Sequence, residues 1–128
     1  MLTEEHRLKL FKLSTYKLFQ KNIENYKKIF LNKLRKKSKN NSIIAVGASA
    51  KGNTFLNYMG LNSKTIFAVT DNSRFKLGKF TPGSHIRIEK DSIFKKTKNV
   101  SAIILSWNFN KMLKKKVLFY NQSVKFIR

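Results

Sequence analysis

The chain has 128 residues and a formal net charge of +22, because 28 Lys and Arg stand against six Asp and Glu. That length is typical of a single domain, and an apolar content of 41% with eleven Phe is enough for a packed core. Cysteine is absent, which excludes disulfide scaffolds, cysteine zinc sites and thiol catalysis. No run of about 18 apolar residues could span a membrane and no apolar secretory segment is present, so we expect a cytoplasmic protein.

The sequence leaves two explanations of the positive charge open. Such a charge is typical of nucleic-acid binders, and any polyanion should bind non-specifically at low salt. The basic residues are 23 Lys and only five Arg, however, and bidentate phosphate and base recognition favours the guanidinium group of Arg. Lys, Asn, Ile and Phe are all abundant and share A/T-rich codons, so genome composition also accounts for much of the excess.

We expect residues 3–36 to form one long amphipathic helix within a leading segment 1–41. Mostly apolar residues recur there at spacings of three and four, which places them on one face: Phe11, Thr15, Phe19, Ile23, Tyr26, Phe30 and Leu34. Two hypotheses follow for this face. It packs on the chain's own domain, which we favour, or it lies on an anionic membrane surface, as basic amphipathic helices do.

Residues 42–128 alternate between short apolar runs and helical patterns. Strands are expected at residues 43–46, 66–69, 100–105 and 124–127, and helices at residues 54–59, 92–98 and 109–120. Residues 86–88 are expected to form at most a short strand piece. A small-residue turn at residues 48–53 precedes the first of these helices, and residues 72–85 form a polar loop with the only proline. This alternation predicts an α/β fold with a mostly parallel sheet of about four strands and helices on its faces.

Ligands of open parallel sheets bind outside the carboxyl ends of the strands, so the candidate site lies in the loops that follow them. The first of these loops, Gly47-Ala-Ser-Ala-Lys51-Gly52-Asn53, departs from the P-loop because Asn53 stands where the motif requires Lys, and it lacks the third glycine of the dinucleotide fingerprint. A small-residue turn that leads into a helix beside Lys51 still suits a phosphate or diphosphate. The alternative is a tight structural turn with a surface lysine.

The later loops carry Asp71, His85 and the pair Trp107-Asn108. An acidic residue at the position of Asp71 often accepts a bond from a ribose hydroxyl, but capping of a turn is an equally good explanation. Neither histidine has a partner that would complete a metal set or a catalytic triad, so a binding domain is favoured over a self-sufficient enzyme.

Three ordered blocks resemble a known family. They are Gly47-Ala-x-Ala-Lys-Gly-Asn-Thr-x-Leu-Asn-Tyr58; Asp71 followed by Lys76-x-Gly-Lys-x-Thr-Pro-Gly-x-His-Ile86; and Trp107-Asn108 with the closing Lys125-Phe-Ile127. This pattern is similar to the C-methyltransferase C-terminal domain, the last domain of S-adenosylmethionine-dependent sugar C-methyltransferases. The similarity covers nearly the whole chain, so a single domain, 1–128, is expected.

The resemblance implies a small Rossmann-like, three-layer domain that binds a nucleotide-diphosphate sugar. It implies no catalytic residue, metal or cofactor in this chain, because methyl transfer from S-adenosylmethionine belongs to a catalytic domain. Either a separately encoded partner chain would supply that domain, or this chain would be the remnant of a longer gene. The implied substrate-side residues are Gly47, Ala48, Lys51, Gly52, Asn53, Asp71, Lys79, Pro82, Gly83, His85, Trp107 and Asn108. Lys51 and the amides of Gly52 and Asn53 would bind the diphosphate, and Asp71 a hydroxyl. His85, Trp107 and Asn108 would shape the base or sugar pocket. The alternative function is a basic module that binds nucleic acid or another polyanion through the same fold.

Overall fold

The computed structural model describes residues 2–128, which divide into two compact units. The first unit ends at Asn32, and the second comprises Lys33–Arg128. The candidate site lies entirely in the second unit. Among the described residues, no helix combines the length and apolar character that crossing a membrane requires.

The leading segment forms two helices, α1 (Leu2–Arg7) and α2 (Leu13–Ser38), so the expectation of one unbroken helix is wrong. The break centres on Lys9, whose φ of 57° lies in the left-handed region. The Lys9 carbonyl accepts hydrogen bonds from Lys12 N at 3.0 Å and from Thr15 Oγ1 at 2.8 Å. Thr15 therefore ties the break to the first turn of α2 and does not extend the apolar face. Phe19 and Tyr26 of that face are exposed, and both hypotheses for it stay predictions.

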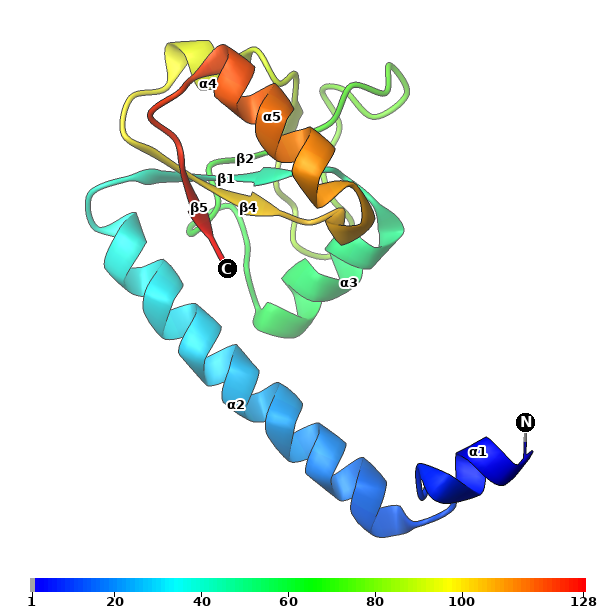
Figure 1. Cartoon of the computed structure of the whole chain (residues 1–128). Coiled ribbons are helices and arrows are strands. Elements are labelled where there is room, and N and C mark those ends of the chain that lie inside the picture. Colours follow the sequence, from blue (N-terminus) through cyan, green and yellow to red (C-terminus); the bar gives the residue numbers. More distant parts are fainter. Residues whose placement is uncertain (1) are drawn as a thin grey trace. The chain divides into compact units, whose positions relative to one another are not determined.

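The second unit is built on a five-stranded parallel sheet (Figure 1). The strands are β1 (Ser42–Val46), β2 (Ala68–Thr70), β3 (Ile88–Glu89), β4 (Val100–Ile104) and β5 (Lys125–Ile127). Their order in the sheet is β3-β2-β1-β4-β5. The α/β prediction is confirmed, with one strand more than expected because the short segment β3 pairs with β2 through Val69 and Thr70.

Helices cover both faces of the sheet, which gives the expected three layers. In Figure 1, α3 (Ala50–Met59) lies on one face, and α4 (Ile93–Lys96) and α5 (Asn110–Tyr120) lie on the other. The alternation of side chains along β1 explains the layering, because Ile44 and Val46 point to the side on which Phe94 and Val117 complete a buried core. A 3₁₀ turn, η1 (Trp107–Phe109), connects β4 to α5.

Helix α3 begins at Ala50, earlier than the expected residue 54, because Ser49 acts as its N-cap. Ser49 has extended backbone angles, and its hydroxyl accepts a hydrogen bond from Gly52 N at 3.1 Å. The apparent turn 50–53 is thus the first turn of the helix. Gly52 is required there because an added Cβ would lie 2.8 Å from Leu105 Cβ, so its absence lets α3 approach the end of β4.

Candidate functional site

The strand order places the site between β1 and β4. This order matches the dinucleotide-binding fold, in which the chain leaves the central strands in opposite directions and opens a crevice at their carboxyl ends. Val46 and Ile104 are partners in the register, so the loops that start at Gly47 and Leu105 are neighbours. Gly47 has a φ of +95°, and a Cβ on it would overlap the Ser106 hydroxyl. Glycine therefore allows the two loops to meet.

The N-terminus of α3 lies beside this crevice, and hydrogen bonds to Ser49 pair two of its amide groups. Gly52 N donates to Ser49 Oγ and Asn53 N donates to Ser49 O. The amides of Ala50 and Lys51 come earlier in the first turn, where helix geometry provides no partner within α3. The Lys51 side chain is exposed beside them. A helix N-terminus with an adjacent lysine favours a bound anion.

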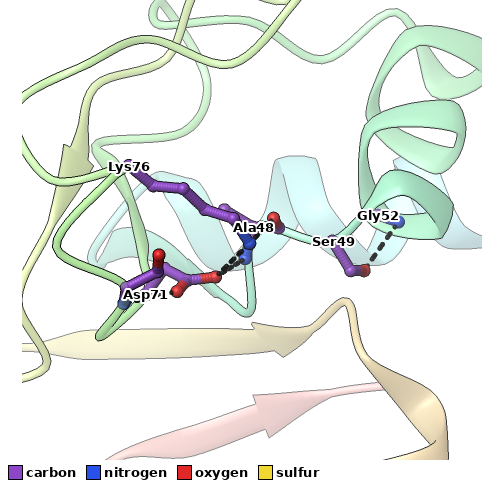
Figure 2. A network of polar contacts seen from close by, with 6 residues as sticks. Ala48, Ser49, Gly52, Asp71 and Lys76 are labelled. Carbon is purple, nitrogen blue, oxygen red and sulfur yellow. Dashed lines mark hydrogen bonds and ion pairs between the residues drawn. The ribbon is translucent and has the colours of Figure 1, made fainter.

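Asp71, at the end of β2, fixes the loop that leads to α3 (Figure 2). Its Oδ2 atom accepts from Ala48 N and from Lys76 Nζ, each at 3.1 Å, and its Oδ1 atom accepts from Ser73 N at 2.9 Å. Lys76 Nζ also donates to Ala48 O at 2.8 Å. A carboxylate has about four acceptor positions, so these three bonds leave room for one ligand hydroxyl.

Two hollows open beside the crevice. The first, which we call the tryptophan hollow, has a volume of about 270 Å³ and is lined by Ser49, Ala50, Lys51, Ser106, Trp107, Asn108 and Phe109. Trp107 and Phe109 are both about half exposed, and Trp107 is held by an edge-on contact with Phe55. The tryptophan hollow thus places an aromatic surface directly beside the N-terminus of α3.

The second hollow, the aspartate hollow, has a volume of about 230 Å³ and shares Ser106 and Phe109 with the first. Its polar groups include Asp71 and an ion pair, in which Lys116 Nζ of α5 lies 2.6 Å from Asp91 Oδ2. The Asp91 side chain is only 5% exposed. This hollow joins the ends of β1 and β2 to α5.

The Thr81–His85 loop is tied to α3 from the side. Asn57 Nδ2 donates to Pro82 O at 3.0 Å and to Asn53 O at 2.8 Å. Gly83 has a φ of +74°, and a Cβ on it would overlap the Asn57 side chain. One contact thus explains both Asn57 in the first sequence block and Pro82-Gly83 in the second.

The structure gathers most of the expected site residues at one edge of the sheet: Gly47, Ala48, Lys51, Gly52, Asn53, Asp71, Trp107 and Asn108. Pro82 and Gly83 lie in the loop bound by Asn57. His85 is exposed and stacks on Phe80 at a centroid distance of 4.4 Å. Lys79 takes part in the edge of the sheet through its backbone, since its carbonyl accepts from Ile88 N. The role of each in ligand binding stays a prediction.

Sequence reasoning missed three side chains at this edge. Lys76 could have been found, because it belongs to the second motif block and is five residues from Asp71. Asp91 and Lys116 are far apart in the sequence, and the only signal was that one of just six acidic residues follows a strand. In the described part of the chain, no group of three or more His, Cys, Asp or Glu could hold a metal ion.

Comparison with known protein families supports the motif analysis. The model of the C-methyltransferase C-terminal domain matches residues 1–128. The resemblance carried by the three sequence blocks is therefore confirmed. No curated protein matches the chain.

Proposed function

The chain belongs to the C-methyltransferase C-terminal domain family, and on that premise we propose that it binds the nucleotide-diphosphate sugar that a sugar C-methyltransferase modifies. The observation that carries the proposal is the position of the N-terminus of α3, with Lys51, next to the aromatic tryptophan hollow. An anion site and an apolar platform a few residues apart suit a sugar joined to a diphosphate.

The diphosphate binds at the first turn of α3. The amides of Ala50 and Lys51 donate to its oxygens, and the Lys51 ammonium supplies the opposite charge. The Asp71–Lys76 contacts hold Ala48 in place, so the entry to the helix is preorganised before the ligand arrives. Preorganised donors bind an anion more tightly because less conformational freedom is lost.

The sugar ring packs in the tryptophan hollow. The lining of this hollow is mainly Trp107, Phe109 and aliphatic carbon, which suits the C–H face of a deoxysugar. Asn108 and Ser106 provide hydrogen-bonding groups for its hydroxyls.

This chain supplies no group that we assign to methyl transfer. A separate catalytic domain binds S-adenosylmethionine and provides the methyl group and the base. The present domain holds the substrate for that partner.

The test is a ligand panel with the unfolding temperature as readout, at ~150 mM salt, where exposed charges more than a Debye length of about 8 Å apart are screened. The panel holds thymidine- and uridine-diphosphate sugars, pyrophosphate, S-adenosylmethionine, a short DNA duplex and anionic lipid vesicles. A ligand at 100 times its Kd adds about 2.7 kcal/mol to the stability, which is readily measured. Stabilisation by a nucleotide sugar well above that by pyrophosphate is expected.

Two matched variants locate the effect. Lys51→Gln removes the charge beside the helix N-terminus and should weaken nucleotide-sugar binding about tenfold or more, since a charge-assisted hydrogen bond contributes roughly 1.5–3 kcal/mol. Lys115→Gln, on the exposed face of α5, removes an equal charge elsewhere and should have little effect. An equal loss of affinity in both variants, together with stabilisation by DNA and pyrophosphate as large as that by any nucleotide sugar, would instead establish a general polyanion binder.

A further inference from the structure

We infer that the aspartate hollow is a nucleobase site, in which the Asp91–Lys116 ion pair recognises the hydrogen-bonding edge of the base. The inference rests on the proposed function and deepens it, because it names the part of the ligand that this second hollow accepts. It depends on the position, size, charge and chemistry of the hollow.

The position of the hollow follows the order of groups in a nucleotide sugar. Asp71 lines the aspartate hollow and its Oδ2 atom binds Ala48 N, two residues before α3. A ribose bound at Asp71 therefore lies between a diphosphate at the N-terminus of α3 and a base in the aspartate hollow. The sugar lies on the other side, in the tryptophan hollow, beyond the shared residues Ser106 and Phe109.

The size and walls of the hollow suit one flat ring. A volume of about 230 Å³ is below the roughly 300–1,000 Å³ of pockets that enclose a whole drug-sized ligand. Phe109, Met112 and Leu113 provide apolar walls from η1 and α5. An aromatic ring packs favourably against such side chains.

The balanced charge of the hollow favours a neutral group over a phosphate. Asp71 and Asp91 are balanced by Lys76 and Lys116, with Nζ–Oδ2 distances of 3.1 and 2.6 Å. The first turn of α3, in contrast, has Lys51 and the positive end of the helix dipole with no acidic residue in it. A diphosphate is therefore drawn to α3 and not to the aspartate hollow.

The ion pair itself has the chemistry that a base requires. Asp91 is an acceptor and Lys116 a donor, side by side, and each nucleobase presents a neighbouring donor and acceptor on its pairing edge. Burying a carboxylate is costly unless it is paired and hydrogen-bonded. The fold nevertheless keeps Asp91 buried at the edge of a hollow, where a ligand can reach the pair through the partly exposed Lys116.

The experiment measures Kd by calorimetry for pyrophosphate and for the diphosphates of thymidine, uridine, cytidine, adenosine and guanosine. The unmodified protein should bind at least one nucleoside diphosphate tenfold or more tightly than pyrophosphate. Asp91→Asn should reduce that advantage about tenfold, or change which base is preferred, and leave the Kd of pyrophosphate unchanged. Glu89→Gln, which removes an ion-paired carboxylate on β3 outside this hollow, should change neither.

The outcomes separate the two proposals. If Lys51→Gln weakens the binding of every ligand while Asp91→Asn leaves the base preference intact, the base site is wrong and the proposed function stands. If no nucleoside diphosphate binds better than pyrophosphate, the base site is wrong and nucleotide recognition fails with it. A measurement on the unmodified protein covers the case in which Asp91→Asn does not fold. Base protons should then show nuclear Overhauser effects to the Met112 methyl group, and effects to the Trp107 ring instead would overturn the inference.

Discussion

Gly47 and Gly60 provide a matched pair for testing how the loop after β1 meets the loop after β4. Both residues have a positive φ, +95° for Gly47 and +70° for Gly60. A Cβ on Gly60 would have no atom within 4 Å, whereas a Cβ on Gly47 would overlap the Ser106 hydroxyl and lie 3.0 Å from Ser106 Cβ. Substitution by alanine thus imposes backbone strain at both positions and a steric conflict only at Gly47.

The difference in unfolding free energy follows from these two terms. Left-handed backbone costs an alanine about 1–2 kcal/mol, so Gly60→Ala should destabilise the protein by about that amount. Overpacking adds typically 1–3 kcal/mol, so Gly47→Ala should cost about 2–5 kcal/mol in total. Adding Ser106→Gly to Gly47→Ala removes the obstructing side chain and should recover about 1–3 kcal/mol relative to the sum of the single changes.

Urea unfolding followed by circular dichroism gives the unfolding free energies of the unmodified protein, the three single variants and the double variant. Equal destabilisation by Gly47→Ala and Gly60→Ala, or strict additivity with Ser106→Gly, would refute the close approach of the two loops. The crevice described between β1 and β4 would then be wider than the structure shows. Such a result would also remove the separation of the two hollows on which the site assignment depends.

Three further predictions concern the elements around the site. Asn57→Ala should cost about 1–3 kcal/mol, since two hydrogen bonds of roughly 0.5–1.5 kcal/mol each are lost, and hydrogen exchange should rise selectively in the loop that contains Pro82. Ser49→Ala should cost about 1 kcal/mol through loss of the N-cap bond to Gly52, which equilibrium unfolding will measure, with Ser49→Asp as the variant that restores it. Ser101→Ala should leave the stability unchanged or raise it by up to about 1 kcal/mol, because the fully buried Ser101 hydroxyl has no hydrogen-bond partner; a loss above 1 kcal/mol would contradict this.

The sheet could be predicted because its strands are continuous apolar runs that are buried on both faces. Residues 43–46 and 100–105 contain little else, and the structure places both at the centre of the sheet. The strands at the edges of the sheet were harder to predict. The strand β3 has two residues, and its pairing with β2 depends on the long loop between them, which no local pattern reveals.

The ends of the helices are set by single contacts, which the spacing of apolar residues does not reveal. The apolar spacing expected for residues 3–36 begins only at Phe11, beyond Lys9, and periodicity records which side chains could share a face and not the backbone angle at one residue. Similarly, the glycine and small residues at 48–53 suggested a turn. Only the packing of Gly52 against Leu105 explains why a glycine belongs inside α3.

Some residues of the candidate site could likewise be predicted from the sequence, and others could not. The loops that carry Gly47, Lys51 and Trp107 could be placed together from strand order alone, since parallel strands end at one edge. Lys76, the partner of Asp71, could have been predicted from the sequence block that contains both residues. The Asp91–Lys116 pair could not be predicted from the sequence, because it forms between a loop and a distant helix only after the sheet has brought them together.

The acidic residues at the strand ends bear on how a chain of net charge +22 could discriminate among anions. A surface of lysines alone attracts every polyanion, and its affinity falls steeply with salt because binding releases counterions. Asp71 and Asp91 change this locally, since each is paired with one lysine, so that these lysines offer no surplus positive charge to a phosphate at the aspartate hollow. The affinity of a long polyanion depends on the number of phosphates that lysines contact, whereas a single diphosphate at α3 depends on few charges. A nucleotide sugar should therefore keep its affinity between 50 and 200 mM salt far better than a DNA duplex, whose affinity falls roughly 10³–10⁵-fold over that range when six to ten phosphates are contacted.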